Sequence, residues 1–424
     1  MNYSVTYPIP SDKTLVAKSL LWAQQFEMVQ YTTNNGIAKG FKQLLGIQFK
    51  VNPKNQSLPS LHKNTWQLGF IGYDYKNQLE NAYHQPKQKN TFEFPDLYFF
   101  EPDILICFED SQFTIHATTN NTSVILAEIE NTFIPVTDEN HQVKFQPDTN
   151  FNTYEEHFNT LKNHILQGDI YITNYCIALT AQNSFLNPVQ LYLKLNQQTP
   201  TPFSSFIKYQ DQYLICASPE RFLKKEGQQL ISQPIKGTAP RGNSEKEDHT
   251  NKTQLQNSIK EKTENVMVVD LVRNDLSRIC DQVNVTELFG IYSFETVHQM
   301  ISTITGKLKE NTGFKDIIKA TFPMGSMTGA PKINAVNSSV ALENFNRELY
   351  SGTVGYITPE GDFDFNVIIR SILHDSKSNS SSIRVGSAIT YNTTATQEWD
   401  ECLLKARSLL SLFKPTSSHG PWLK

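Results

Sequence analysis

Short apolar runs recur along this chain, and their length and punctuation constrain its fold more than any other feature. Each run is rich in aromatic and branched residues and is bounded by polar or glycine-containing connections, which is typical of β-strands. The serine-rich stretch 376–382 between the last two runs predicts a flexible hairpin loop. We therefore expect strands in both halves of the chain. The clearest runs are WQLGFIGYDY (66–75), DILICF (103–108), QYLICA (212–217), QQLIS (228–232), FDFNVIIRSIL (363–373) and IRVGSAITY (383–391).

Two segments follow a helical period instead. In the first, apolar residues recur at spacings of three, four and three, and in the second they keep the same period to the end of the pattern. Thr394 and Gln397 stand where a capping box would start the second helix. The apolar positions are Val269, Val272, Leu276 and Ile279 in the first segment, and Trp399, Cys402, Ala406, Leu409 and Phe413 in the second.

The polar stretch 138–153 is interpreted as a linker. It divides the chain into a β-rich N-terminal lobe, residues 1–137, and a second domain, residues 151–414. A chain of 424 residues is long enough for two domains or for one large unit with an N-terminal lobe.

Charge and cysteine usage exclude several classes of function. The net charge of −4 offers no basic excess to neutralise phosphates, so no nucleic-acid or membrane-surface partner is expected. The N-terminus lacks a basic segment followed by an apolar run, and no apolar stretch reaches membrane-spanning length. The five cysteines have no CxxC spacing, so neither a disulfide framework nor a zinc site is predicted. A cytoplasmic location fits these observations.

Lys236 is a candidate nucleophile. It stands in PIKGTAPRG (234–242), between an extended apolar dipeptide and a Gly-Thr turn, where a single amine would be exposed at the end of a strand. A lysine amine that its surroundings deprotonate can attack an electron-poor carbon. The alternative is a solvated surface lysine.

Two pairs of glutamates are candidate metal ligands. Glu261 and Glu264 are three positions apart, as are Glu398 and Glu401, so each pair projects from one face of a helix. Four carboxylates that converge would suit Mg²⁺, which is often shared between a few carboxylates and an anionic substrate. The alternative is that these acids are solvated, with Lys262 or Lys405 as exposed partners.

The loop GSMTGAPK (325–332) is a candidate anion site. Its small residues allow backbone N–H groups to turn toward an anion at the start of a helix. Its glycine spacing is too short for a P-loop and no Gly-Lys-Ser/Thr follows, so nucleotide binding has little support. A tight turn before a helix, without a ligand, is the alternative.

Taken in order, five motifs resemble the chorismate-utilising enzymes, a family that includes the large subunits of anthranilate synthase and aminodeoxychorismate synthase. The resemblance covers about residues 151–413, and five ordered motifs are far more specific than any one of them. It implies an α+β fold of antiparallel β-sheets packed as a sandwich with helices on the outside, in which residues 151–414 form the chorismate-binding catalytic domain. The motifs are PERF, PIKGT, ENVMVVDLVRNDL, GSMTGAPK and the WDE of the last helix.

The resemblance also implies roles for individual residues. Glu264 and Glu401 are expected to bind Mg²⁺ directly, and Glu261 and Glu398 to bind it directly or through water. Tyr350 and Arg370 are expected to hold the enolpyruvyl carboxylate, with Arg370 on a strand face shared with Asp364 and Asn366 by alternation. His298 is placed near the substrate ring, although a buried structural histidine is nearly as favourable. Further substrate contacts are expected from Ser326, Thr328, Gly329, Lys332 and Gly386.

Within the family, lysine at position 236 is typical of aminodeoxychorismate synthases, whereas the other branches usually carry a small residue there. The implied mechanism has Lys236 attack C2 of chorismate while Glu220 protonates the departing C4 hydroxyl, and ammonia then displaces the lysine at C4. The alternative for Glu220 is an ordinary surface pair with Arg221. None of the five cysteines has the setting of a glutaminase nucleophile, so a separate glutamine amidotransferase subunit is implied as partner.

Three departures from the family pattern leave alternatives open. This chain has GSAIT (386–390) where GAGIV is common, follows the pattern GDxYQVNL only loosely at 168–179, and lacks a clear LLES element, so feedback control by tryptophan is less expected. Anthranilate synthase component I is the nearest rival function. An enzyme that forms isochorismate or salicylate, and a non-catalytic chorismate-binding subunit, are the other candidates.

Overall fold

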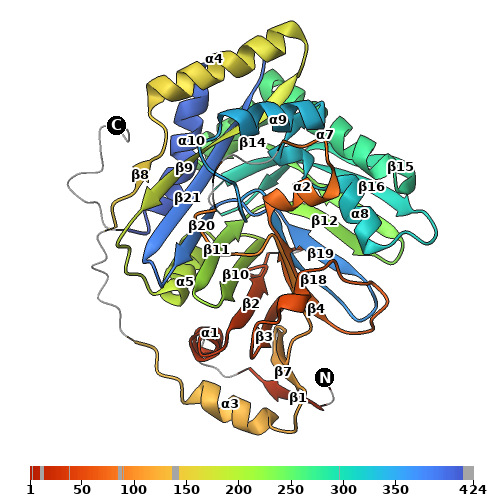
Figure 1. Ribbon diagram of the computed structural model, residues 1–424, viewed down its shortest axis with the longest axis vertical. Coiled ribbons are helices and arrows are strands. Elements are labelled where there is room, and N and C mark those ends of the chain that lie inside the picture. The colour runs from red at the N-terminus through yellow and green to blue at the C-terminus, as the bar shows by residue number, and fades with distance from the viewer. Residues whose placement is uncertain are drawn as a thin grey trace.

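A computed structural model describes residues 1, 3–9, 14–37, 39–84, 88, 90–135, 143–295 and 297–413. Within these residues the strands form two sheets, of twelve and nine strands, and every strand pair is antiparallel (Figure 1). Antiparallel pairing and helices that cover the outer faces confirm the predicted α+β sandwich.

The larger sheet joins a block of N-terminal strands to strands from the rest of the chain. Its order is β1-β7-β6-β3-β2-β10-β11-β20-β21-β9-β17, and β8 also pairs with β9. The division into two domains stays a prediction, and part of the predicted linker lies outside the described residues. The strands are β1 (Tyr3–Pro8), β2 (Met28–Thr33), β3 (Gln43–Gln48), β6 (Ile104–Phe108), β7 (Gln112–Ala117), β8 (Gln146–Pro147), β9 (Ile172–Ala181), β10 (Phe203–Tyr209), β11 (Gln212–Ser218), β17 (Gly329–Ala330), β20 (Ser371–Asp375) and β21 (Ser380–Ile389).

The smaller sheet also combines distant segments. Its order is β14-β16-β13-β12-β19-β18-β4-β5, and β15 pairs with β16. The N-terminal strand β4 lies next to the C-terminal strand β18, so residues before 137 complete both sheets. The strands are β4 (Gln67–Ile71), β5 (Leu97–Phe100), β12 (Arg221–Glu226), β13 (Gln229–Gln233), β14 (Ile235–Pro240), β15 (Cys280–Ser293), β16 (Val297–Leu308), β18 (Thr353–Ile357) and β19 (Phe363–Asn366).

Helices cover the outer faces of the two sheets. In Figure 1, α4, α9 and α10 gather at one end of the molecule, while α1 and α3 lie at the other. The helices are α1 (Leu15–Ala23), α2 (Lys76–Leu79), α3 (Thr122–Glu130), α4 (Phe151–Gln167), α5 (Pro188–Gln198), α6 (Glu245–Asn257), α7 (Ile259–Ser277), α8 (Phe314–Thr321), α9 (Lys332–Leu342) and α10 (Ala395–Leu410), with 3-10 turns η1 (Pro53–Asn55), η2 (Tyr73–Tyr75) and η3 (Gly325–Met327).

Three apolar layers hold this arrangement together. Leu214 of the larger sheet and Phe70 and Val354 of the smaller sheet belong to the layer between the sheets. A second layer packs α1, α3, α4, α5 and α10 on the outer face of the larger sheet, and a third packs α7 and α8 on the smaller sheet. Both predicted helices are confirmed as α7 and α10, and Thr394 with Gln397 forms the predicted capping box. The helices end earlier than predicted, so Ile279 and Phe413 lie beyond them.

Two predicted strands differ from the structure. The run 66–75 is a strand only over Gln67–Ile71 and continues as the 3-10 turn Tyr73–Tyr75. The run 363–373 splits into β19, which belongs to the smaller sheet, and β20, which belongs to the larger sheet. The chain crosses between the sheets at 367–370, and Arg370 has a left-handed φ of 53°. Arg370 therefore does not share a strand face with Asp364 and Asn366, because the alternation stops at the crossover.

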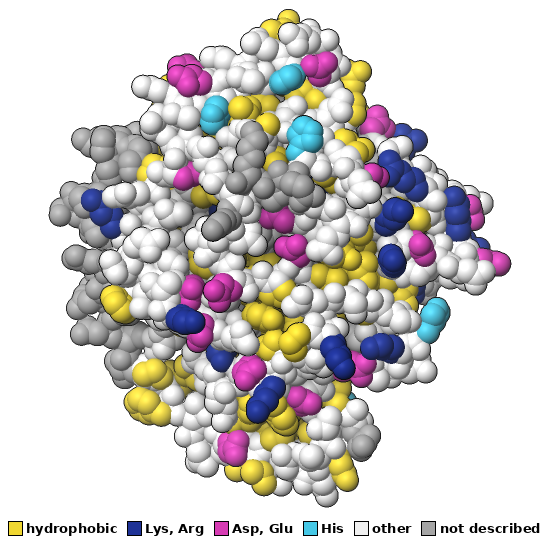
Figure 2. All heavy atoms as spheres, in the orientation of Figure 1, with side chains coloured by type: hydrophobic (Ala, Val, Ile, Leu, Met, Phe, Trp, Pro, Cys, Tyr) yellow, Lys and Arg dark blue, Asp and Glu magenta, His cyan; other side chains and the backbone are white. Residues whose placement is uncertain are grey.

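On the face shown in Figure 2, Lys and Arg side chains are interspersed with Asp and Glu. Within the described part of the chain, no helix combines the length and the apolarity that crossing a membrane requires.

Asp364 forms a buried ion pair with Arg221. The Arg221 Nε and Nη2 atoms lie 2.9 and 3.0 Å from the two carboxylate oxygens, and the side chains are 4% and 2% exposed. The guanidinium also lies over the ring of Phe203. This pair joins β12 to β19 and leaves Glu220 without Arg221 as a partner.

We predict that Asp364→Ala lowers the free energy of unfolding by about 3 to 5 kcal/mol, because it leaves the buried Arg221 guanidinium unpaired. Urea denaturation measures this loss. Glu101→Ala, which breaks the exposed Lys63–Glu101 pair, is the control and should change stability by less than about 1 kcal/mol. Equal effects of the two substitutions would contradict the prediction.

Candidate functional site

A β-bulge sets the position of Lys236. Between the pairs Ile235↔Ile301 and Thr238↔Gln299, β14 has one residue more than β16. Gly237 fills the bulge with a φ of 92°, and a Cβ atom at this position would lie 3.0 Å from the Glu261 carboxylate. The bulge thus brings the backbone beside Lys236 into close contact with the N-terminal part of α7.

Lys236 lines a cavity of about 230 Å³. Thr328, Gly329 and Ala388 line the same cavity, together with Asn174 of β9. A neighbouring cavity of about 340 Å³ is lined by Glu220, and the two cavities share Gly325 and Ser326. The structure therefore brings Lys236, Glu220 and the 325–329 loop together around two neighbouring cavities, where Lys236 is half-buried.

Glu220 is a buried carboxyl beside Lys236. Burial raises its pKa to about 7, although a hydrogen bond with Ser326 and the charge of Lys236 act in the opposite direction. A surface pair with Arg221 does not form, because Arg221 is bound to Asp364. A carboxyl with this pKa is about half protonated at neutral pH and can therefore donate a proton.

Three of the four candidate glutamates, Glu261, Glu264 and Glu401, lie within electrostatic range of Lys236. Glu261 and Glu264 come from α7. Burial raises the pKa of each above its usual value, although the charge of Lys236 partly opposes this shift. Glu398 and Glu401 come from α10. Burial and the charge of Glu401 raise the pKa of Glu398 to about 7. Burial would also raise the pKa of Glu401, but Lys405, Lys236 and Lys260 together lower it.

The four glutamates provide the oxygen ligands that a hard cation such as Mg²⁺ prefers. Oxygen Oε1 of Glu264 and Oε2 of Glu398 are buried and accept no hydrogen bond, and carboxylates are ligands that Mg²⁺ prefers. In the described part of the chain, no three acidic, His or Cys side chains lie close enough together to hold a metal as they stand. The Lys260 ammonium lies between α7 and α10, near Glu264 and Glu398.

Tyr350 and Arg370 lie near each other on the side of the site that faces Glu401. Burial raises the pKa of Tyr350 well above its usual value. Burial lowers the pKa of Arg370, although the negative charges of Tyr350 and Glu401 act to raise it. A cation in these surroundings favours the binding of a carboxylate.

The 325–332 loop is a 3-10 turn followed by the short strand β17, which pairs Gly329 with Thr173 of β9. The Thr328 hydroxyl donates to the carbonyls of Met324 and Gly325. The Lys332 Nζ atom lies 2.5 Å from Asp275 Oδ2, and Lys332 lines neither of the two cavities. Substrate contact by Lys332 stays a prediction.

Residues 16–411 match the chorismate binding enzyme family. The chain belongs to this family.

The relatives include proteins named for two different activities. The chloroplastic aminodeoxychorismate synthase of Arabidopsis thaliana is 34% identical over 80% of this chain and 39% of that protein. Aminodeoxychorismate synthase component 1 of Escherichia coli is 32% identical over 72% of this chain and 68% of that protein. Anthranilate synthase component 1 of Saccharomyces cerevisiae is 32% identical over 84% of this chain and 74% of that protein. This chain thus spans less than half of the length of the Arabidopsis protein.

The fold agrees with this membership. The crystal structure of anthranilate synthase component I from Streptococcus pneumoniae superposes with a TM-score of 0.72, covers 96% of this chain and 92% of that chain, and is 24% identical. Identity at this level shows the shared fold, not the reaction.

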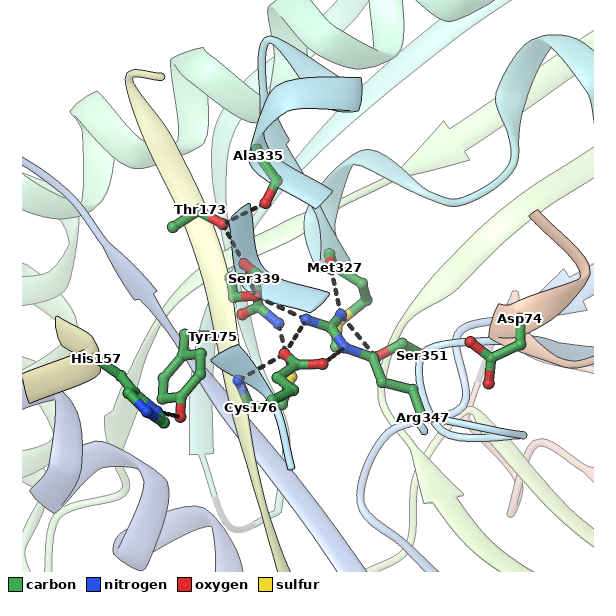
Figure 3. Close-up of polar contacts among 12 residues, drawn as sticks. Asp74, His157, Thr173, Tyr175, Cys176, Met327, Ala335, Ser339, Arg347 and Ser351 are labelled. Carbon is green, nitrogen blue, oxygen red and sulfur yellow. Dashed lines mark hydrogen bonds and ion pairs between the residues drawn. The ribbon is translucent and has the colours of Figure 1, made fainter. Parts of the chain in front are cut away.

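Arg347 is a residue of the chorismate-binding fold that sequence reasoning missed. Its guanidinium is buried and donates to the carbonyls of Met327 and Asn174, each at 2.8 Å, while Glu343 balances its charge (Figure 3). Met327 belongs to the 325–332 loop and Asn174 lines the cavity of Lys236. Arg347 therefore fixes two walls of the site. The Glu-x-x-x-Arg spacing was the available signal, but it shows only the ion pair.

Lys405 has a larger role than the exposed partner expected from sequence. Its Nζ atom lies 2.7 Å from both Glu401 Oε1 and the carbonyl oxygen of Gly386. It thus joins α10 to the GSAIT segment of β21. A Cβ atom on Gly386 would lie 2.7 Å from Cys176 Sγ, so this position requires glycine. Substrate contact by Gly386 stays a prediction.

His298 is buried on β16 and both of its ring nitrogens are engaged. Nε2 lies 2.9 Å from Asp248 Oδ1 and Nδ1 lies 2.9 Å from Ser293 Oγ. Arg241 pairs with the same aspartate, so the three residues tie α6 to the β14–β16 pair. The predicted role next to the substrate ring stays a prediction.

We predict that Glu220→Gln gains stability relative to the wild type as pH rises. The pKa of Glu220 in the folded protein is about 7 against an ordinary value of 4.5, so its contribution to stability is fully present below pH 4.5 and is lost as pH rises through about 7. Glutamine has no such loss. Between pH 4.5 and 8 the difference in unfolding free energy should move by about 3 kcal/mol in favour of the variant.

Urea denaturation across this pH range checks the prediction, with Glu155→Gln at an exposed position of α4 as the control. A Glu220→Gln difference that stays constant with pH would show that Glu220 titrates normally.

Proposed function

We propose that this chain is the chorismate-converting subunit of an aminodeoxychorismate synthase, which forms 4-amino-4-deoxychorismate from chorismate and ammonia. The observation that carries the proposal is the position of Lys236. Lys236 lines the cavity that Ser326 and Thr328 also line. It lies within electrostatic range of Glu220 and of Glu264 and Glu401, two members of the acid cluster formed by Glu261, Glu264, Glu398 and Glu401. An amine in this place can reach a ring that the cavity binds.

In the proposed first step, the Lys236 nitrogen forms a bond to C2 of chorismate and the ring double bonds shift. The C4 hydroxyl then leaves as water with a proton from Glu220. The raised pKa of Glu220 supports this role, because it keeps a protonated fraction at neutral pH. Ammonia next bonds to C4, the double bonds shift back, and the Lys236 amine leaves with the electrons of its bond to C2.

The remaining residues orient the substrate. Arg370 and Tyr350 would hold the enolpyruvyl carboxylate, and Ser326, Thr328 and the Gly329 amide would contact the ring substituents. Glu264 and Glu401 would hold Mg²⁺, with Glu261 and Glu398 as direct or water-mediated ligands. When bound, Mg²⁺ would neutralise the ring carboxylate and make the ring more electrophilic.

Ammonia is proposed to come from a separate glutamine amidotransferase subunit. The name "component 1" of the Escherichia coli relative supports a second component. The use of the product for para-aminobenzoate and folate, and the cytoplasmic location, stay predictions.

Anthranilate synthase component I is the second candidate, because the relative from Saccharomyces cerevisiae is as similar in sequence as the one from Escherichia coli. It would add nitrogen at C2 and release pyruvate. Lys236 favours the first candidate, since a covalent lysine at C2 would block that position.

Product analysis distinguishes these functions. The purified chain, incubated with chorismate, Mg²⁺ and ammonium, should form aminodeoxychorismate and no anthranilate, as measured by chromatography of the products. Omission of ammonium should abolish turnover, whereas an isochorismate former would continue. Formation of anthranilate with release of pyruvate would refute the proposal.

Intact-protein mass spectrometry tests the covalent step. Without ammonium, the wild type should gain the mass of chorismate less one water, and Lys236→Ala should not. We expect Lys236→Ala to lose at least about a hundredfold in kcat, because the attacking group is gone. Lys262→Ala is the control, because this half-buried lysine of α7 lies over the Phe289 ring and lines neither cavity. A Lys236→Ala variant with full turnover would remove lysine from the mechanism.

A further inference from the structure

Lys260 occupies the space between the two helices that carry the acid cluster. Its Nζ atom lies 3.4 Å from Glu398 Oε1 of α10 and 3.9 Å from Glu264 Oε1 of its own helix α7. Glu261 and Glu401 are also within electrostatic range of this ammonium. One lysine therefore faces all four acids, and it alone bridges Glu264 and Glu398 among the ion pairs of the described residues.

The burial of the partners differs sharply. The Glu398 and Glu264 side chains are 1% and 9% exposed, whereas the Lys260 side chain is 42% exposed. The two carboxylates are thus fixed in the protein, while the lysine reaches them from the solvent side on a long, flexible stem. Carboxylates buried side by side repel each other, so a cation between the helices stabilises their charged forms.

We propose that Lys260 is the resident counter-ion of the acid cluster, and that a divalent cation binds there by displacing its ammonium. This inference rests on the metal site of the proposed function. The ammonium lies 3.9 Å from Glu264 Oε1, one of the two buried oxygens of the acid cluster that accept no hydrogen bond, and an ammonium held there would repel a metal ion bound between Glu264 and Glu398.

The exposed stem of Lys260 provides the route. Rotation about its side-chain bonds carries the ammonium into solvent without a change in the backbone of α7. Metal binding then exchanges one positive charge for two at the same carboxylates. Lys260 thereby keeps the metal-free protein stable and lowers its affinity for metal by competition.

The test is direct metal binding without chorismate. Mg²⁺ titration by isothermal calorimetry, repeated with Mn²⁺ by electron paramagnetic resonance, is carried out on the wild type, Lys260→Met and Lys262→Met. Methionine keeps much of the length of lysine and removes its charge. Lys262 is the matched control, because it carries the same charge two positions away and its Nζ atom lies over the Phe289 ring.

We expect Lys260→Met to lower the Kd for Mg²⁺ by about tenfold, because no internal cation competes for the carboxylates, and Lys262→Met to change it less than about twofold. The metal-free Lys260→Met protein should also melt at a lower temperature than the wild type and gain more from added Mg²⁺. Lys260→Gln repeats the test if the methionine variant does not fold.

Two failures can be told apart. If the wild type and Lys260→Met bind metal equally, or if the variant binds more weakly, Lys260 is not a competitor and the inference is wrong while the metal site stands. If none of the three proteins binds either metal at millimolar concentration, the metal site of the proposed function is wrong and the inference falls with it.

Discussion

The concentration of negative charge between α7 and α10 is the constraint on which the site depends. Four glutamates from two helices face one region, and two of them are almost fully buried. Buried carboxylates this close together keep their negative charges only when cations lie beside them. Lys236, Lys260 and Lys405 supply these cations in the protein itself, and each does so from a different element. The same arrangement that stabilises the acids therefore gathers the groups that could act on an anionic substrate.

The sequence predicts those parts of the fold that depend on local pattern. The periodicity of α7 and α10 and the capping box at Thr394 were readable because helices are set by contacts three and four positions apart. The acids on these helices, and the grouping of Lys236 with Glu220, could be predicted because the motifs occur together in one family. Their roles in catalysis rest on that resemblance.

The sequence does not show where the chain changes sheet. The run around Arg370 looks like one strand because every residue suits a strand, and only the tertiary structure reveals that it serves two sheets. Arg347 and Lys260 escaped notice for a related reason. Each acts on groups from elements far away in sequence, namely the carbonyl of Asn174 and the carboxylate of Glu398. Single-sequence patterns contain no signal for such contacts.

The pairing of N-terminal strands with strands much later in the chain affects how this protein is synthesised and folded. Gln30 donates a hydrogen bond to the carbonyl of Gly355, a partner 325 positions further along, and β4 pairs with β18 near the other end of the chain. Synthesis on the ribosome proceeds from the N-terminus, so β2 and β4 can pair early with β3 and β5, but their other neighbours, β10 and β18, emerge only later. During that interval their apolar faces and open edges are exposed to other chains. The biogenesis of this enzyme should accordingly depend on chaperones that shield nascent strands, and its yield should respond to the speed of translation.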